Sequence, residues 1–504
     1  MENTVNKDRS RLRSSLRRIA AAGLFGLCSL SAAFAQKQDY VQYVNTLQGT
    51  DSKFELSYGN TYATTGMPYG MHTWGAQTGP NGEGWKYQYS VDKIRGFQQA
   101  HQCSPWMSDY AVYSLMPEVG ELVVNEDARA SKFSHANEIA KPHYYRVTLD
   151  NGITTEMAPT TRGVHLRFTY PRKGDAYLVL DGYFAMSGMK IDPAKRQISG
   201  WVNNQRFVNH PETFRNYFVI QFDRPFEEYG LWENEHDERF PGMTEGEGKG
   251  YGAYVRFTAG TKVQARAASS YISPEQALLT LDRELGADKN LEATRKRGAE
   301  TWNALLGRIA VEGGTDEEIR TFYSCLFRAN LFSRKFYERD AEGNPYYYSP
   351  YDGKVHAGYM YTDNGFWDTF RSQFPLTNIL HPAGGTGAVR LAAIVVGARR
   401  DGRHDRQPRH FAADRRMGQR HPHVRPPKGA GSLRQGGDEQ RPVGRCQRPR
   451  GMEGVLAAGI RLLPRVDGLD GTDARIRLRR FLRLPAGAHD RQQVLRGDLL
   501  TRDV

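Results

Sequence analysis

The chain has 504 residues, 39% of them hydrophobic, and a formal net charge of +13, which on its own suggests an anionic partner. The charge is unevenly distributed: residues 383–504 carry 25 Arg and 1 Lys against 12 acidic residues, whereas the first 382 carry 43 basic and 44 acidic residues. All 7 Trp and all 27 Tyr precede residue 383. Two differently composed stretches therefore meet near residue 383, and a basic nucleic-acid-binding protein is excluded for the first.

Residues 1–35 have the features of a secretory signal peptide. A basic stretch (residues 7–18) precedes an apolar run (residues 19–30), and a small-residue cleavage pattern ends at Ala35. The apolar run is too short to span a bilayer permanently. Cys28 would suit a lipoprotein, but Leu27 stands where a small residue is required. We expect cleavage after Ala35, export to the periplasm or the exterior, and no integral membrane segment.

From residue 36 to about 270, short alternating runs are bounded by Gly, Pro, Asn and Asp, without helical periodicity. Residues 144–149 and 153–157 flank an Asp-Asn-Gly turn, which predicts a β-hairpin. We predict a large antiparallel β-sandwich for residues 36–270. Further strand candidates lie at residues 177–180, 217–222 and 254–257.

The pattern then becomes helical. Ser273 with Gln276, and Thr315 with Glu318, have the spacing of capping boxes at two helix starts. After the second pair, apolar residues recur at steps of three and four as far as Phe332. We predict a helical linker at residues 271–313 and the incomplete start of an all-α domain at residues 314–382. Within that domain, a third helix is predicted at residues 367–380.

The exported part contains only two cysteines, Cys103 and Cys325. Two cysteines in almost 350 residues exclude a disulfide scaffold. A single bridge between them is left open by the sequence, and two buried free thiols are the favoured alternative.

Residues 383–504 allow three interpretations: a disordered basic tail, an Arg-rich nucleic-acid-binding arm, or a frameshift. Evolved basic arms mix Lys with Arg, and a disordered tail is not expected to begin inside an amphipathic helical repeat. Codons compatible with three segments, read one base later, spell MIGNHAIS, GWLPSWSAPGET and TLEYAYDD, which match the composition upstream. We therefore interpret the last quarter as unstructured, out-of-frame sequence after a frameshift near residues 384–388. The three segments are residues 404–411, 390–401 and 473–480.

Three clusters combine aromatic residues with polar and acidic ones: YGNTYATTGMPYGMHTW (58–74), GWKYQYSVDKIRGFQQAHQCSPWMSDY (84–110) and YTDNGFWDTFR (361–371). Aromatic rings stack on the C–H faces of sugars, while carboxylates and amides bind hydroxyl groups. Taken singly, spacing favours core packing for Trp85 and Trp106 and a structural role for His101. Residues 36–382 contain no metal-ligand spacing, Ser-His-Asp order or phosphate loop.

At these clusters the sequence resembles glycoside hydrolase family 92, a family of exported α-mannosidases. The resemblance covers residues 38–382. It implies a β-sandwich packed on an (α/α)6 barrel with the site at their interface. It also implies calcium-dependent, inverting exo-hydrolysis of α-mannosides, commonly α-1,2-linked, so that the partner is a mannose-containing glycan. The matching stretches are YVNTLQGTD from Tyr43, GNTYATTGMPYGM from Gly59, IRGFQQAHQCSPWMSDY from Ile94, MPEVGEL from Met116 and GFWDTFR from Gly365.

By this resemblance, no catalytic or metal-binding residue can be assigned in the chain. The general acid of the family resembles the Glu of the hidden TLEYAYDD string, whose codon overlaps that of Arg475. The base and the calcium ligands are expected beyond Val504. Because an acid or a base each contributes about 10²–10⁴-fold, we expect a family member without activity. The substrate-binding residues implied are Trp367 and Asp368, and on the sandwich side Gly66, Trp85, His101 and Trp106.

A different class of function remains open from the sequence. The sandwich alone would suit a non-catalytic carbohydrate-binding or surface-interaction protein. A nucleic-acid-binding protein that uses the Arg-rich tail is the least favoured alternative, and we expect no nucleic-acid partner.

Overall fold

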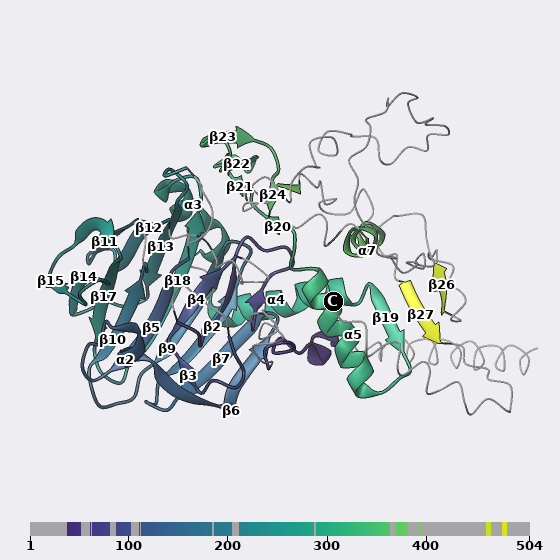
Figure 1. The fold of residues 1–504 in the computed structure, drawn as a ribbon, viewed down its shortest axis with the longest axis horizontal. Coiled ribbons are helices and arrows are strands. Elements are labelled where there is room, and N and C mark those ends of the chain that lie inside the picture. Colours follow the sequence, from purple (N-terminus) through teal and green to yellow (C-terminus); the bar gives the residue numbers. More distant parts are fainter. Residues whose placement is uncertain are drawn as a thin grey trace, which may run out of the picture.

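The structure is a computed structural model. It describes residues 38–51, 61, 63–80, 87–101, 110, 112–183, 186–203, 211–286, 289–362, 369, 371–381, 393–394, 460–464 and 476–480. The described chain begins with a short 3-10 helix, η1 (Tyr40–Tyr43), and continues into two large β-sheets, followed by helices and short strands (Figure 1).

The two sheets are antiparallel and form a β-sandwich, as the sequence predicts. In the first sheet the strands follow the order β1 (Thr65–Gly66), β2 (Thr73–Gln77), β4 (Gly96–Ala100), β5 (Ser114–Val119), β10 (Ala176–Asp181), β17 (Tyr251–Phe257), β14 (Glu228–Glu233), β15 (Arg239–Pro241). In the second the order is β16 (Glu245–Lys249), β11 (Met186–Asp192), β12 (Gln197–Val202), β13 (Asn216–Phe222), β18 (Lys262–Ser270), β9 (Gly163–Thr169), β8 (Thr154–Pro159), β7 (Tyr144–Leu149), β6 (Ser131–Lys141), β3 (Lys93–Ile94).

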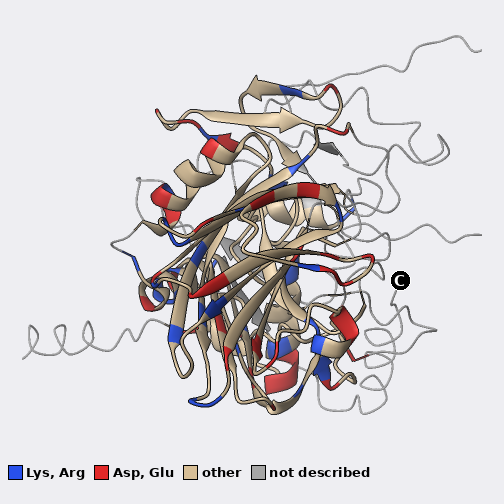
Figure 2. Ribbon diagram, turned by 90° about the vertical axis from the view of Figure 1, so that its left-hand side faces the viewer, with Lys and Arg blue, Asp and Glu red and all other residues tan. Residues whose placement is uncertain are grey.

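The core lies between the sheets. Strand β9 shows how the sequence builds it, since Val164, Leu166 and Phe168 alternate with polar residues and are at most 1% exposed. The predicted hairpin is confirmed: β7 and β8 pair with Thr148 opposite Thr154, and Gly152 in the turn has a φ of +87°. Basic and acidic residues are interspersed over the described ribbon (Figure 2), in keeping with the balanced charge upstream of residue 383.

Two helices, α3 (Pro274–Leu285) and α4 (Leu291–Leu306), follow the last sandwich strand and cover the outer face of the ten-stranded sheet. Ser273 caps α3 by accepting from the N–H of Gln276 at 3.2 Å. The second bond of the predicted capping box is replaced, because the Gln276 side chain donates to the carbonyl of Arg339 at 2.9 Å. The buried face of α3 packs on the sheet through Ala277, Leu281 and Leu285, which contact Val219 and Ala268.

Helix α5 (Asp316–Ala329) begins with the predicted capping box of Thr315 and Glu318, in which both bonds are present. Helix α7 (Gln373–Leu380) confirms the end of the third predicted helix, while most of its expected first turns lie outside the described residues. Cys325 on α5 is exposed, which corrects the prediction of a buried thiol there, and Cys103 lies outside the described residues. None of the described helices is long and apolar enough to span a membrane.

The segment between α5 and α7 differs from the all-α expectation, because it forms short strands. A small sheet of β21 (Glu338–Arg339), β22 (Pro345–Ser349) and β23 (Lys354–Ala357) is rich in tyrosine, and Gly343 turns the chain between β21 and β22 with a φ of +90°. Aromatic residues favour strands, and this preference overrides the surrounding helical context. The strands of the region are β19 (Ile309–Glu312), β20 (Arg334–Lys335), β21 (Glu338–Arg339), β22 (Pro345–Ser349), β23 (Lys354–Ala357) and β24 (Tyr361–Thr362).

The prediction that the last quarter is unstructured is not met where the structure describes it. β25 (Ala393–Ile394) pairs with β24, and β26 (Ile460–Pro464) pairs with β27 (Ile476–Arg480), which adds parallel to β19. In β27 the sequence alternates Ile476 and Leu478 with arginines, a period of two that suits a strand whatever its reading frame.

Candidate functional site

Two buried histidines lie side by side where strands β2 and β4 meet. Thr73 is paired with Ala100 across these strands, so His72, which precedes β2, lies opposite His101, which follows β4. Nε2 of His101 is 3.0 Å from Nδ1 of His72, and neither residue is more than 1% exposed. The sheet register therefore brings both rings to one end of the sandwich.

The hydrogen bonds of His101 determine which ring nitrogens carry protons. Its Nδ1 is 2.7 Å from the carbonyl oxygen of Tyr110. Because a carbonyl oxygen can only accept, Nδ1 carries the proton and Nε2 carries a lone pair. That lone pair accepts from Nδ1–H of His72 and from the side-chain amide of Gln99 at 3.1 Å. The remaining lone pair, on Nε2 of His72, has no hydrogen-bond partner among the described residues.

Burial keeps His72 uncharged. Burial first, and then the neighbouring His101 and Arg334, hold the pKa of His72 well below its ordinary value. His72 therefore hydrogen-bonds to His101 as a neutral ring near pH 7. Because His101 bonds to the carbonyl of Tyr110, it joins the two ends of residues 102–109, the stretch that contains Trp106.

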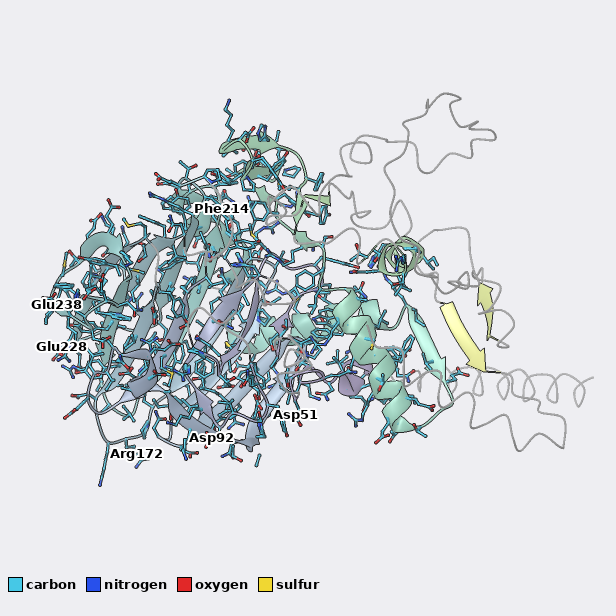
Figure 3. All side chains as sticks on the ribbon, in the orientation of Figure 1. Asp51, Asp92, Arg172, Phe214, Glu228 and Glu238 are labelled. Atoms are coloured by element: carbon cyan, nitrogen blue, oxygen red, sulfur yellow. The ribbon has the colours of Figure 1, made fainter. Side chains whose placement is uncertain are left out.

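Arg334, in β20, ties the chain after α5 to the same end of the sandwich. Its guanidinium is fully buried and donates to the carbonyl of Met71 and to the phenol oxygen of Tyr110. The ring of Tyr110 in turn stacks on His101, with ring centroids 4.9 Å apart. Phe214, labelled in Figure 3, stacks on Tyr271 with centroids 5.4 Å apart, and Tyr271 contacts both histidine rings.

A buried carboxyl group belongs to the same interface. Oε1 of Glu338, in β21, accepts from the backbone N–H of Tyr271 at 2.8 Å. Burial raises the pKa of Glu338 to about 7, against hydrogen bonds from Ser270 and Tyr271 that lower it. This carboxyl group therefore gains or loses its proton near neutral pH while it holds β21 against the sandwich.

An ion pair and a lysine lie next to this carboxyl group. Arg162 pairs with Glu284 of α3 at 2.9 Å and donates to the carbonyl of Tyr337 at 2.6 Å. Burial, followed by the charge of Arg162, lowers the pKa of Lys335 to about 8. The interface between sandwich, helices and short strands thus contains several titratable groups with perturbed pKa values, which are typical of functional sites.

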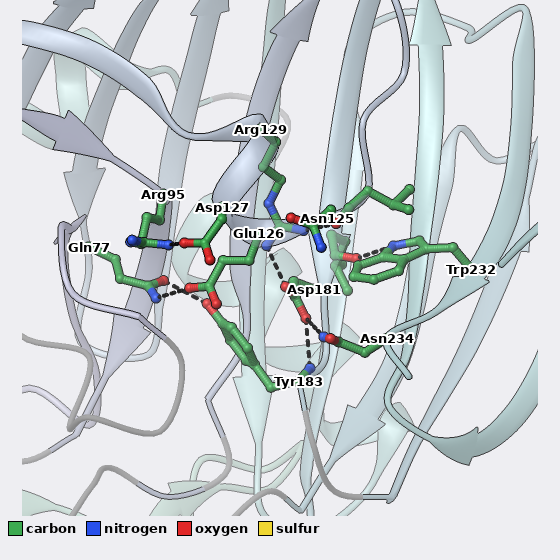
Figure 4. A network of polar contacts seen from close by, with 12 residues as sticks. Gln77, Arg95, Asn125, Glu126, Asp127, Arg129, Asp181, Tyr183, Trp232 and Asn234 are labelled. Carbon is green, nitrogen blue, oxygen red and sulfur yellow. Dashed lines mark hydrogen bonds and ion pairs between the residues drawn. The ribbon is translucent and has the colours of Figure 1, made fainter. Parts of the chain in front are cut away.

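Another polar network lies on the outer face of the eight-stranded sheet and holds the short helix α2 (Glu126–Arg129) in place (Figure 4). Arg129 forms a buried ion pair with Asp181, and its guanidinium lies 5.6 Å from the ring centre of Trp232. Asp181 also accepts from the N–H of Tyr183 at 2.8 Å and from Asn234 at 3.3 Å. Since the carboxylate is engaged by protein on every side shown, we assign this network a structural role.

Two of the six predicted sugar-binding residues are described, and they lie in different settings. His101 is part of the histidine pair. Gly66, in β1, accepts from the indole N–H of Trp302 at 2.7 Å, and a Cβ atom at Gly66 would lie 2.9 Å from Cγ2 of Thr73. The absence of a side chain at Gly66 therefore permits close packing of β1 against Thr73 of β2. The other four, Trp85, Trp106, Trp367 and Asp368, lie outside the described residues.

Sequence reasoning missed several residues that the structure places beside His101. His72 was within a quoted cluster, but only the pairing of β2 with β4 shows that it faces His101. Arg334 and Glu338 follow α5 in a segment that was expected to be helical. A buried charge flanked by aromatic residues, as in the stretch around Arg334, is the local signal that could have marked them.

The donor set at this interface does not fit a calcium ion. Ca²⁺ is bound by six to eight oxygen atoms, mostly from carboxylates and carbonyls. The histidine pair presents ring nitrogens beside the cation of Arg334, and the described residues contain no group of three or more His, Cys, Asp or Glu side chains suited to a metal. Calcium chemistry therefore cannot be built from the described part of the chain.

Two family models match the chain: the N-terminal domain of glycosyl hydrolase family 92 at residues 43–270, and the catalytic domain of that family at residues 276–415. The second match continues past the change of composition near residue 383. The fold is a β-sandwich followed by helices, and together with these matches it defines the class of the protein as a glycoside hydrolase by fold. The chain belongs to glycoside hydrolase family 92.

Solved structures agree with this assignment. An inverting mannosidase of family GH92 from Bacteroides thetaiotaomicron is 47% identical, with a TM-score of 0.65 over 68% of this chain and 46% of that one. A family GH92 glycosyl hydrolase, ccman5, is 26% identical, with a TM-score of 0.60 over 68% and 47% of the two chains. An uncharacterized secreted glycosidase of Arthroderma benhamiae is 22% identical over 61% of this chain and 43% of its own length. The chain spans about half the length of these relatives.

Proposed function

We propose that the chain derives from an exported, inverting α-mannosidase that removes mannose from α-1,2-linked glycans with the help of calcium. The observation that supports this most is the 47% identity to a solved inverting mannosidase across the sandwich and the first part of the catalytic domain. Inversion needs a general acid at the glycosidic oxygen and a base that activates water on the opposite face of the sugar. The calcium ligands of such an enzyme would lie outside the described residues.

In this proposal, Trp367 and Asp368 contact the sugar from the catalytic side, and Trp85 and Trp106 from the sandwich. His101 is a positioning residue, because its bond to the carbonyl of Tyr110 fixes the ends of the stretch that contains Trp106. Gly66 is a packing residue: it has no side chain to clash with Thr73 of β2, and its carbonyl accepts from the indole of Trp302.

We further propose that the 504-residue polypeptide is inactive, because residues after about 384 are read out of frame and omit the catalytic acid. The absence of Trp and Tyr after residue 382, together with the excess of Arg there, supports this. The family match that runs to residue 415 weighs against a frame change before that residue. Nucleotide sequencing across codons 380–415 is therefore the first test, and a continuous frame there would contradict the proposal.

Activity provides the second test. The purified 504-residue chain and a frame-restored version would be assayed with an α-1,2-linked mannobiose. We expect hydrolysis by the restored chain alone, with release of β-mannose detected by NMR, because the acid and the base each contribute about 10²–10⁴-fold. Turnover by the 504-residue chain would show that its catalytic residues have been misassigned.

A carbohydrate-binding protein without catalysis is the second candidate. It is favoured by the sandwich, which has a complete core of its own between two sheets. Titration of the 504-residue chain with mannobiose, with a galactose disaccharide as control, tests this function: saturable binding of the mannoside without hydrolysis supports it.

Export is proposed on the basis of the signal-like N-terminus and the secreted relative. Expression with the native N-terminus in a Gram-negative host should yield a mature protein that begins at Gln36. N-terminal sequencing of the purified product, with Ala33→Arg and Ala35→Arg as a blocked-cleavage control, tests the site.

A further inference from the structure

A pocket far along the sandwich from the histidine pair lies on the outer face of the ten-stranded sheet, next to the loop that joins α3 to α4. Its volume is about 430 Å³, within the range of sites for small molecules. Gln221 of β13, Arg266 of β18 and His165 of β9 stand opposite one another in register, so their side chains share this face. Their sequence neighbours Phe222, Ala265 and Leu166 point into the core.

The lining is positively charged. It contains Arg196, Arg266 and Lys289 against one carboxylate, Asp223. Arg196 donates to the backbone carbonyl of Asp223 at 2.9 Å, and Lys289 donates to the carbonyl of Arg283 at 2.7 Å.

Arg266 is held in the same way. It donates to the carbonyl of Leu285 at 2.7 Å and to the amide oxygen of Gln221. Carbonyl and amide oxygens satisfy hydrogen bonds without neutralising charge, so the pocket retains a net positive charge. Burial lowers the pKa of Arg266. Among the described residues, the acid whose charge raises it is Asp282, which is exposed on α3.

His165 contributes a buried ring to the lining. The residue is 5% exposed, and its Nδ1 is 2.9 Å from the hydroxyl oxygen of Thr294. Burial, and then the charge of Arg266, lower the pKa of His165 to about 4, against a hydrogen bond with the Lys289 backbone that raises it, so the ring is neutral at pH 7.

The pocket also lies at the start of α4, which is 16 residues long. Asn290 lines the pocket and caps this helix through the N–H of Ala293, at 2.8 Å. The N-terminus of a helix carries a partial positive charge and attracts anions. Cations and a helix start therefore converge on one pocket.

We propose that this pocket binds a small molecule that carries an oxyanion: a phosphate, sulfate or carboxylate group. The three cations and the helix start would stabilise the negative charge of the ligand. A cation is excluded by charge, and a neutral sugar would leave the positive lining uncompensated. The proposed ligand is bound independently of the glycosidase reaction, so the two proposals can fail separately.

Calorimetric titration of the full chain at low salt would use inorganic phosphate, glucose 6-phosphate and glucose. We expect saturable binding of the two phosphates and none of glucose. Tighter binding of glucose 6-phosphate would identify a phosphorylated sugar as the preferred source, and equal binding would identify the free ion. Failure of both phosphates to bind saturably would overturn the proposal.

Variants locate the binding. Lys289→Met should weaken phosphate binding about tenfold, the usual effect of removing one charged hydrogen bond. Arg196→Asn, at an exposed turn position whose φ of +54° suits Asn, should weaken it as well. Lys354→Met, which removes an exposed lysine on the β22–β23 hairpin, is the matched control and should leave it unchanged. Circular dichroism would establish that each variant is folded, and equal losses in the Lys289 and Lys354 variants would contradict this site.

Discussion

At the scale of single residues, the described part of the chain contains many buried charges, and their environments decide what each one does. Asp181 accepts hydrogen bonds and forms an ion pair with Arg129. Glu338 is just as buried, but it receives only neutral donors at close range, so burial raises its pKa. Two carboxyl groups at equal depth thus have different partners, an ion pair in one case and neutral donors in the other.

The Arg129–Asp181 pair leads to a prediction about stability. Asp181→Asn should lower the free energy of unfolding by about 3–5 kcal/mol, because it leaves a buried guanidinium without its counter-ion. Glu245→Gln breaks the exposed pair with Lys190 and should cost less than about 1 kcal/mol. Urea unfolding of both variants makes the comparison, and equal losses would contradict a structural role for the buried pair.

Glu338 leads to a prediction about pH. Its pKa in the folded chain, about 7, is above the ordinary 4.5, so the folded state holds its proton more tightly than the unfolded state. Stability from this group is therefore complete below about pH 4.5 and is lost as the pH rises through 7. Glu338→Gln should be neutral at pH 5 and stabilising at pH 8, by about 3 kcal/mol at most.

Urea unfolding at the two pH values tests this, with Glu300→Gln, at an exposed position on α4, as control. A Glu338 variant whose stability followed the parent at both pH values would show that the carboxyl group is already ionised in the fold.

At the scale of elements, short sequence patterns predicted the turns and helix starts that depend on neighbouring residues. The Asp-Asn-Gly turn gave the β7–β8 hairpin, and Thr315 with Glu318 gave the start of α5. The strands between α5 and α7 were not predicted. Each contains only a few residues, such as Arg334 in β20, and its conformation depends on contacts with residues far away in the sequence. The same applies to the candidate site: His101 lay in a recognisable motif, but its partner His72 follows only from the pairing of β2 with β4.

The capping box of α5 can be tested directly. Thr315→Ala removes the side-chain oxygen that accepts from the N–H of Glu318 at 3.3 Å, and should cost about 1 kcal/mol. Thr301→Ala, in the interior of α4, should be neutral or slightly stabilising because alanine favours helix. Thermal unfolding distinguishes the two, and a destabilised Thr301 variant would show that the cap is not the cause.

At the scale of the whole molecule, the sandwich and the two helices behind it form the part of the chain that positions the interface. The interface is lined with nitrogen donors and lacks a set of oxygen ligands among the described residues. Under the proposal that the calcium ligands are lost with the out-of-frame part of the chain, addition of millimolar CaCl₂ or of EDTA should shift the thermal midpoint by less than about 1 °C. A midpoint that rises with calcium concentration would place ligands in the chain and overturn this expectation.

The bond from the Trp302 indole to the Gly66 carbonyl affects how the β-sandwich can be isolated as a fragment. A fragment cut after residue 270 would uncover the apolar strip on which Leu281 and Leu285 rest, and would strand that carbonyl without its donor. Such a fragment should aggregate during purification. One extended to Gly307 keeps both helices in place and is the shortest piece worth expressing.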